Sequence, residues 1–364
     1  MRRIRFIGAT LVAVALTASA CGGGDDDNTV GGGQSSDTTA ARPTFAAGTT
    51  MANLQSKGKM IVGVKFDQPG LGQKNPVTNK IEGFDVEIAK QIALGIYGGK
   101  IEDIESKIEF REATTPNREV FLENNTVDMV VATYTINDAR KQRIDFAGPY
   151  YIAGQDIMVK ANDNSIRGVN DLAGKKTCSV RNSTPAANVK RVVPTADLTE
   201  FDQYSDCVQA LRDGRVQSVT TDNSILLGFV AGAPTEFKIV GNKFTDEPYG
   251  IGVKRGDDAF RNYINDRLEA IYANGEWAKL FAATLGKLGI PTPTPPPVNR
   301  YTSAGAAPAT TSGGGTATTI AGAGSGTATT TVTGGTATTS AGGGGTTTAP
   351  STTVASTTST TRAS

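Results

Sequence analysis

Two hydrophobic patterns alternate along the middle of the chain, between about residues 52 and 290. Short apolar runs predict strands, and segments with an apolar residue every three or four positions predict amphipathic helices. Strands are predicted at residues 60–64, 108–110, 129–132, 156–159, 176–180, 217–220 and 237–240. This alternation is typical of an α/β fold with mostly parallel sheets, and the length is enough for two lobes.

The helix that follows Gly83 has the clearest pattern. Asp85 can cap it, six apolar residues between Val86 and Ile96 share one face, and Gly98 and Gly99 end it. Other helices are expected to begin near Pro185, Ser205 and Ser224, and a further one spans residues 260–272. The apolar stripe of the last helix indicates core packing.

Both ends of the chain lack a core-forming pattern. Residues 22–50 are rich in Gly, Asp, Ser and Thr, and from Pro291 a proline-rich stretch leads into a long Thr, Ala and Gly tract. Such segments bury too little apolar surface to offset the entropy of ordering. We expect a flexible tether at residues 21–51 and a disordered tail at residues 291–364. The composition leaves open whether the tail carries O-linked sugars or is a plain spacer.

The first 20 residues have the three parts of a secretory signal peptide. Basic residues are followed by an apolar stretch too short for a lasting membrane span and by small residues before Cys21. A cysteine at this place resembles a bacterial lipobox, although Ala18 stands where that motif prefers Leu. We expect an exported protein whose Cys21 is lipidated and anchors it to the outer face of the cell membrane. The alternative is ordinary cleavage near Ala20 with a free thiol.

Charge and composition exclude several functions. The chain has 36 basic and 35 acidic residues with no basic block outside the signal, which argues against nucleic acid as a partner. It has no histidine, so triads with a histidine base and histidine-based zinc sites are excluded. No catalytic residue, metal site or cofactor is predicted.

Cys178 and Cys207 are the remaining cysteines. Because export favours oxidation, one disulfide is expected between them. The alternative is a pair of free, buried thiols.

The segment from Gly83 to Ile88, continued by Ile92, Ala93 and Ile96, resembles the signature of the family 3 solute-binding proteins, the amino-acid receptors of ABC importers. Four further segments resemble the actinobacterial glutamate-type binding lipoproteins: residues 65–70, 131–134, 145–150 and 182–185. The resemblance implies a periplasmic binding protein fold of type II, with two lobes joined by a two-segment hinge. It places lobe 1 at residues 52–150 and 247–290, lobe 2 at residues 151–246, and the crossings near residues 151–154 and 244–248.

The loop that leaves the strand at residues 129–132 holds the first candidate ligand residues. Strand ends are where α/β sheets bind ligands, and an arginine can offer a carboxylate two parallel donors. The resemblance implies that Arg140 and Thr135 hold the α-carboxylate of an amino acid, and Thr133 begins the same loop. The alternative is a surface arginine paired with Asp138 or Asp145.

The second lobe is expected to contribute three more residues. Ser183 and Thr184 precede a proline-started helix, where free amides can bind an anion or a side chain can cap the helix. The resemblance implies that they hold the same carboxylate and that Asp222, at a strand exit, pairs with the α-ammonium. For Asp222 the alternative is a helix cap.

Selectivity for the ligand side chain depends on three other positions. By resemblance, Lys65 and Arg118 contact a distal carboxylate, and Tyr204 replaces a histidine of some relatives. Glutamate or aspartate is therefore favoured, and glutamine is compatible. An isolated, solvated Lys65 is the alternative. The aromatic rings of Phe66 or Tyr134 could stack on the ligand or only pack the wall.

These expectations describe a monomeric receptor that closes on an amino acid and docks on the permease subunits of an ABC importer, without breaking a bond. Two other functions stay open: a sensory subunit that presents the ligand to a signalling partner, and an exported dehydratase on the same fold. Product analysis distinguishes the enzyme from the receptor.

Overall fold

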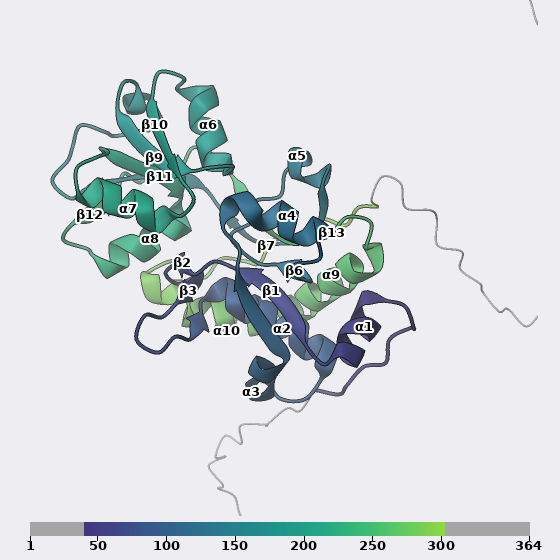
Figure 1. Cartoon of the computed structure of the whole chain (residues 1–364). Coiled ribbons are helices and arrows are strands. Elements are labelled where there is room, and N and C mark those ends of the chain that lie inside the picture. Colours follow the sequence, from purple (N-terminus) through teal and green to yellow (C-terminus); the bar gives the residue numbers. More distant parts are fainter. Residues whose placement is uncertain (1–39, 303–364) are drawn as a thin grey trace, which may run out of the picture. The chain divides into compact units, whose positions relative to one another are not determined.

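The structure is a computed structural model that describes residues 40–302, and two five-stranded sheets organise them (Figure 1). The first sheet, in lobe 1, has the order β5-β1-β6-β13-β7: β1 (Met60–Val64), β5 (Ile108–Glu112), β6 (Met129–Val130), β7 (Ile144–Ala153) and β13 (Glu247–Lys254). The second, in lobe 2, has the order β10-β9-β11-β8-β12: β8 (Gln155–Lys160), β9 (Lys176–Val180), β10 (Asp197–Phe201), β11 (Ser218–Asp222) and β12 (Phe237–Ile239). A small third sheet consists of β2 (Asp67–Gln68), β3 (Gly72–Lys74) and β4 (Ile81–Glu82).

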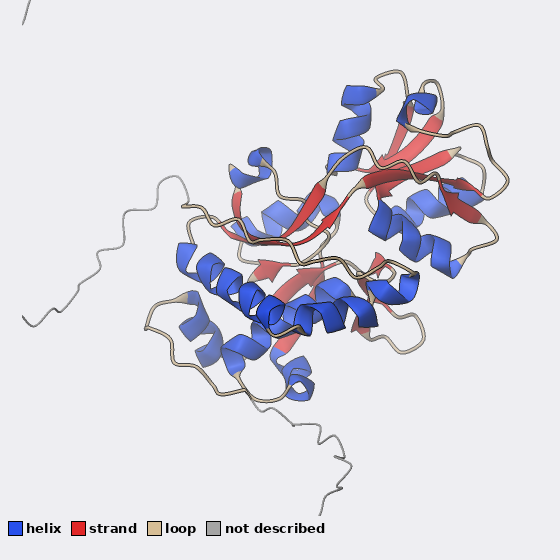
Figure 2. Cartoon of the chain, turned by 180° about the vertical axis from the view of Figure 1, so that it is seen from behind, coloured by secondary structure: helices blue, strands red, loops and turns tan. Residues whose placement is uncertain are grey.

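Helices pack around each sheet (Figure 2). Lobe 1 has α1 (Thr50–Lys57), α2 (Phe84–Tyr97), α3 (Ile101–Ile104), α4 (Arg118–Glu123), α5 (Asp138–Lys141), α9 (Asp258–Ala273) and α10 (Glu276–Ala283). Lobe 2 has α6 (Thr184–Val192), α7 (Tyr204–Arg212) and α8 (Asn223–Gly232). The short 3₁₀ turns are η1 (Glu105–Lys107), η2 (Thr115–Asn117), η3 (Val169–Leu172) and η4 (Leu285–Leu288).

The apolar face of α2 forms much of the core of lobe 1. All six apolar residues that the sequence places on this face are buried. Phe84, at the start of α2, contacts the rings of Tyr150, Trp277 and Phe281, which come from β7 and α10. Burial of each such side chain contributes roughly 1.5 to 3 kcal/mol, so this cluster fixes α2 against the strand that leads out of lobe 1.

The sheets are mixed, which corrects the expectation of mostly parallel sheets. In each sheet four strands point the same way and one, β13 or β8, runs against them, so only two of the four strand pairings are parallel. The reason is that the chain leaves lobe 1 through β7 and returns through β13, and these two strands pair along their length from Glu247 with Ala153 to Lys254 with Ile144. Gly154 follows β7 directly, and β8 begins at Gln155.

Both ends of the folded region extend further than the sequence predicts. Ala40 bridges to Gly99, Phe45 packs edge-on against Tyr263, and α1 begins at Thr50 within the expected tether. At the other end, the hydroxyl of Tyr301 accepts a hydrogen bond from the amide of Phe146. Contacts to residues far away in sequence order these segments, and local composition does not reveal such contacts. The first 39 and last 62 residues, with the expected signal peptide, Cys21 and the Thr-rich tract, lie outside the described residues.

Cys178 of β9 and Cys207 of α7 form the disulfide that the sequence predicts, with their Cα atoms 5.5 Å apart. The bond fixes α7 to the central strands of lobe 2. Within residues 40–302, no helix has both the length and the apolar character needed to cross a membrane.

Candidate functional site

A small polar cavity lies between the two lobes. Eight of the nine candidate ligand residues line it: Arg118, Thr133, Thr135, Arg140, Ser183, Thr184, Tyr204 and Asp222. The other lining residues are Thr115, Pro185, Thr221 and Ile225.

The loop after β6 is held in a conformation that its sequence alone would not favour. Thr133 has a φ of 44°, which is rare for a β-branched residue. Its amide donates to the carboxylate of Asp85 at 2.8 Å, and its hydroxyl donates to Gln68 at 3.0 Å. The other oxygen of the Asp85 carboxylate accepts from the Tyr150 hydroxyl at 2.7 Å. These bonds fix the start of the loop that carries Thr135 and Arg140.

Asp85 therefore has a different role from the cap that the sequence predicts. The N-cap of α2 is Gly83, and Asp85 lies fully buried within the first turn. Burial raises the pKa of Asp85 to about 6, and the hydrogen bonds from Tyr150 and Thr133 oppose that rise. The segment that begins at Gly83 thus positions the loop that carries Thr135 and Arg140.

Replacing Asp85 with alanine tests this positioning role. The change leaves a buried amide and a buried hydroxyl without an acceptor, at about 1 to 3 kcal/mol each. We expect the free energy of unfolding, measured with urea, to fall by roughly 2 to 5 kcal/mol. Glu87→Ala, in the same turn, removes only a partly exposed ion pair with Lys90 and is expected to cost under about 1 kcal/mol. Equal losses in the two variants would contradict the assignment.

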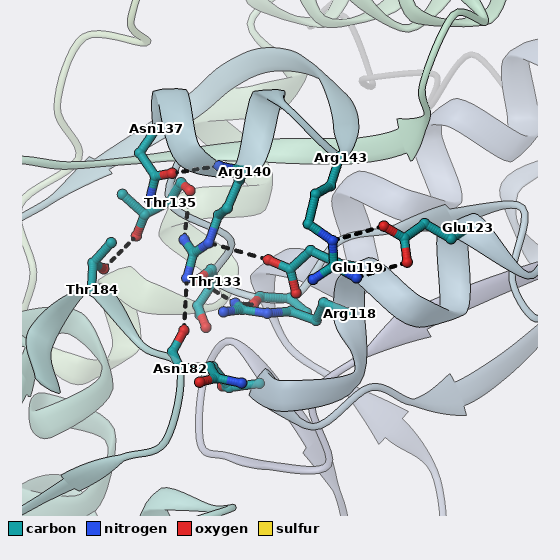
Figure 3. Close-up of polar contacts among 12 residues, drawn as sticks. Arg118, Glu119, Glu123, Thr133, Thr135, Asn137, Arg140, Arg143, Asn182 and Thr184 are labelled. Carbon is teal, nitrogen blue, oxygen red and sulfur yellow. Dashed lines mark hydrogen bonds and ion pairs between the residues drawn. The ribbon is translucent and has the colours of Figure 1, made fainter. Parts of the chain in front are cut away.

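Arg140 is 7% exposed and reaches both lobes (Figure 3). Its Nη1 donates to the Thr135 carbonyl at 2.6 Å, its Nη2 donates to the Asn182 carbonyl at 3.2 Å, and its Nε lies 3.4 Å from Glu119. A guanidinium has five N–H donors, so these three contacts leave two for a ligand. Burial, with the nearby charge of Arg118, lowers the pKa of Arg140 to about 10, so it is charged at neutral pH. It pairs with neither Asp138 nor Asp145.

Arg118, the first residue of α4, is the second cation of the cavity wall. Its Nη1 donates to the carbonyls of Ala132 and Thr133, at 3.0 and 3.2 Å. The guanidinium carbon lies 4.1 Å from the centre of the Tyr134 ring, and that of Arg140 lies 5.0 Å from the same centre. Tyr134 is fully buried and does not line the cavity; nor does Phe66. The tyrosine ring thus supports both arginines instead of stacking on a ligand.

Lys65 is the candidate residue that does not line the cavity. Its ammonium donates to the hydroxyl of Thr115, at 2.8 Å, and Thr115 does line the cavity. The side chain is 3% exposed, which rules out the solvated alternative. Burial, with the nearby charge of Arg118, lowers the pKa of Lys65 to about 7. The sequence did not identify Thr115 as a cavity residue, because a polar residue between a strand and a proline, here Pro116, is common in loops.

In lobe 2, Ser183 caps α6: its hydroxyl accepts from the amide of Ala186 at 3.0 Å. The Thr184 hydroxyl donates to Glu247 at 2.6 Å and lies 3.3 Å from the Thr135 hydroxyl. Pro185 has no amide, so the amide of Thr184 is the donor left at this end of α6. Ser183 therefore both caps α6 and lines the cavity.

Asp222 occupies the N-cap position of α8 but makes no capping hydrogen bond. Instead, its Oδ2 accepts from the Tyr249 hydroxyl at 2.6 Å, and its buried Oδ1 has no hydrogen-bond partner among residues 40–302. Burial, with the nearby charge of Glu247, raises the pKa of Asp222 to about 8, and the Tyr249 bond opposes this rise. A buried acceptor without a partner is costly, so this oxygen is suited to a cationic ligand group.

Tyr204, Thr221 and Ile225 complete the wall on the side of lobe 2. Tyr204 begins α7, which the disulfide fixes to β9. Thr221 and Ile225 flank Asp222, and the sequence did not single them out because neither carries a charge. Taken together, the cavity offers cationic donors from one lobe and a carboxylate from the other.

Two α/β lobes joined by paired strands, with a polar cavity lined from both, define the class of bilobed ligand-binding proteins. The chain belongs to the bacterial extracellular solute-binding proteins, family 3, whose family model matches residues 60–287.

Several relatives are named for the amino acid that they bind. The chain is 42% identical, over 236 residues, to the glutamate-binding protein GluB of Corynebacterium glutamicum, with 63% of this chain and 79% of the relative covered. It is 39% identical to the glutamine-binding protein GlnH of Bacillus subtilis, with 64% and 83% covered. Among solved structures, an ancestral arginine-binding protein bound to glutamine superimposes with a TM-score of 0.58 at 35% identity, covering 63% of this chain and 98% of that one.

Proposed function

We propose that the protein is the substrate-binding lipoprotein of an ABC importer and that it holds glutamate or aspartate in the cavity between its lobes. It is a receptor and not an enzyme, and it needs no cofactor. The names of its relatives as glutamate- and glutamine-binding proteins support the ligand class.

The observation that carries the proposal is the unpartnered Oδ1 of Asp222, in the same cavity as Arg140. An α-amino acid has an ammonium and a carboxylate on one carbon. Asp222 is placed to accept from the ammonium, while Arg140 and the amide of Thr184 donate to the carboxylate. Charge-assisted bonds contribute about 1.5 to 3 kcal/mol each, so three or four of them reach the roughly −8 kcal/mol of a micromolar complex after ordering costs.

Charge balance supports an acidic side chain on the ligand. The cavity wall carries two cations, Arg118 and Arg140, and one carboxyl group, Asp222, which a ligand ammonium ionises, and the buried Lys65 lies behind Thr115. A zwitterion satisfies Arg140 and Asp222 and leaves Arg118 without a counter-charge. A distal carboxylate supplies that charge, and an amide does not. Glutamate and aspartate are therefore favoured over glutamine and asparagine.

The remaining parts of the proposal concern the protein outside its site. Cys21 carries the lipid that anchors the exported protein to the outer face of the membrane, and the closed monomer docks on the permease subunits. Residues 52–150 with 247–290 move as one lobe against residues 151–246, with the crossings near residues 151–154 and 244–248 as the hinge. Support comes from the lipobox-like sequence, the family membership and the pairing of β7 with β13.

A thermal-shift panel of the proteinogenic amino acids tests the proposed function. Glutamate or aspartate should raise the melting temperature, and the recovered amino acid should be chemically unchanged after prolonged incubation. A protein that responds to no amino acid, or one that converts its ligand, would overturn the receptor assignment.

Replacing Lys65 with alanine tests whether this residue recognises the distal carboxylate of the ligand. We expect glutamate affinity to fall by about 1 to 3 kcal/mol, because the variant removes a buried positive charge and the donor that orients Thr115. Glutamine serves as the internal control and should lose much less, as measured by calorimetry. Equal losses for both amino acids would show that Lys65 does not read the distal charge.

A further inference from the structure

A second set of contacts joins the lobes beside the cavity, around the segment Asp67, Gln68 and Pro69 of lobe 1. Asp67 accepts hydrogen bonds at one carboxylate oxygen from the amides of Tyr204 and Ser205, at 2.9 and 3.2 Å. These are the first two residues of α7 in lobe 2, whose own N-cap residue, Gln203, makes no capping side-chain bond. Asp67 thus caps a helix of the opposite lobe, where the helix dipole favours a negative charge.

Two further contacts surround this cap. The side-chain amide of Gln203 donates to Glu112 of β5 at 2.6 Å. On the neighbouring helix, Gly228 of α8 faces Pro69 so closely that a Cβ atom at that position would overlap the Pro69 carbonyl. Glycine is needed there because of this close approach of the backbone, since Gly228 itself is helical and unstrained.

We propose that this seam, formed by Asp67, Pro69 and Glu112 against Gln203, Gly228 and the start of α7, sets the closing equilibrium of the lobes. It thereby sets the affinity for every ligand of the cavity by the same factor. Asp67, Pro69, Glu112, Gln203 and Gly228 do not line the cavity, and Tyr204 at the start of α7 enters the seam through its backbone amide alone. The inference about affinity rests on the proposed function, whereas the seam contacts themselves do not.

The physical reason is linkage between closure and binding. The apparent affinity is the intrinsic affinity multiplied by the fraction of protein in the binding-competent conformation. A contact that forms only when the lobes meet, and that does not touch the ligand, changes this fraction alone. Residues of the cavity wall instead change the intrinsic affinity, which differs from one amino acid to another.

Gly228→Ala tests the seam, and Gly232→Ala is its matched control. Both glycines lie in α8, but a Cβ at Gly232 meets nothing within 4 Å. Because overpacking costs about 1 to 3 kcal/mol, we expect Gly228→Ala to weaken glutamate and glutamine binding alike by about 5- to 100-fold in calorimetry. Gly232→Ala should bind both as the wild type does. Thermal unfolding of both variants confirms that lobe 2 is folded.

Asp67→Ala supplies a second variant, with Asp206→Ala, an exposed acid in the first turn of α7, as its control. Loss of an N-cap costs typically about 1 kcal/mol, so glutamine affinity should fall about 5-fold, and glutamate affinity somewhat further because the charge of Asp67 also favours the charged form of Lys65. Hydrogen exchange at the amides of Tyr204 and Ser205 should become faster in Asp67→Ala and Gly228→Ala, with or without ligand.

Unchanged affinity and unchanged exchange in both variants would overturn the seam. A loss of affinity confined to one amino acid would also contradict the proposal, because the segment would then recognise the ligand side chain. If the wild type binds no amino acid, the proposed function fails, and amide exchange at Tyr204 and Ser205 decides on the seam by itself.

Discussion

Arg140→Ala will abolish the thermal response to glutamate and lower its affinity by at least a hundredfold. Removing one partner of a buried charge pair costs about 3 to 5 kcal/mol, and each 1.4 kcal/mol is tenfold. Here the ligand α-carboxylate would lose its two remaining guanidinium donors, and the two lobes would lose the bond from Arg140 to Asn182. Calorimetry measures the affinity directly.

Arg143→Ala is the matched control for this variant (Figure 3). Arg143 lies three residues further along, is 48% exposed and forms its ion pair with Glu123, away from the cavity. Its loss should leave glutamate affinity within about twofold of the wild type. An exposed ion pair contributes about 0 to 1 kcal/mol to folding stability, and this pair does not contribute to ligand binding. Arg140→Lys should restore little, since an ammonium cannot offer two parallel donors. Wild-type affinity in Arg140→Ala would refute the clamp.

Asp222→Asn is expected to weaken every amino-acid ligand strongly. The variant keeps the shape of the side chain but removes the charge that faces the ligand ammonium, at about 2 to 5 kcal/mol. Asp156→Asn is the control: Asp156 is also buried in lobe 2 but accepts from the amides of Ile157 and Gly241, outside the cavity. A loss of similar size in the two variants would show a general effect of buried charge and contradict the ammonium site.

The pH dependence of binding tests the roles of Asp222 and Lys65 together. The pKa of Asp222 is about 8 without a ligand, and an ammonium stabilises its charged form, so binding releases a proton below pH 8 and affinity rises with pH. The pKa of Lys65 is about 7, and a distal carboxylate raises it, so binding takes up a proton above pH 7 and affinity falls. Glutamate affinity should therefore show both the rise below pH 8 and the fall above pH 7, whereas glutamine affinity should show mainly the rise. The Asp222→Asn variant should lose the rise. A flat glutamate profile in the wild type would contradict both roles.

Much of the fold follows from local patterns in the sequence. β1 and β9 have the predicted bounds, and α6, α7 and α8 begin within one residue of their predicted starts, because strand runs and helix caps are local signals. The antiparallel pairing of β7 with β13 was not predicted, since about 100 residues separate the two strands and pairing is not encoded by either alone. The ordered segments around Phe45 and Tyr301 were missed for the same reason.

The site shows a similar division between local and distant information. Resemblance selects residues that share one cavity, but it does not reveal how each is held. Asp85 was expected to cap its helix, and instead it fixes Thr133, 48 residues away. Lys65 was expected in the wall and lies behind Thr115, while the hydroxyl of Thr184 is occupied by Glu247. Side-chain contacts between distant loops decide these roles.

The central claim is that the cavity selects an amino acid with a second carboxylate. Calorimetry with glutamate, aspartate, glutamine and asparagine at pH 7.0 tests it most directly, since all four share the α-carbon groups and differ only in side-chain length and charge. We predict one site per chain, with glutamate or aspartate bound at least about tenfold more tightly than either amide, which corresponds to about 1.4 kcal/mol. Glutamine or asparagine binding as tightly as, or more tightly than, both acids would contradict the claim.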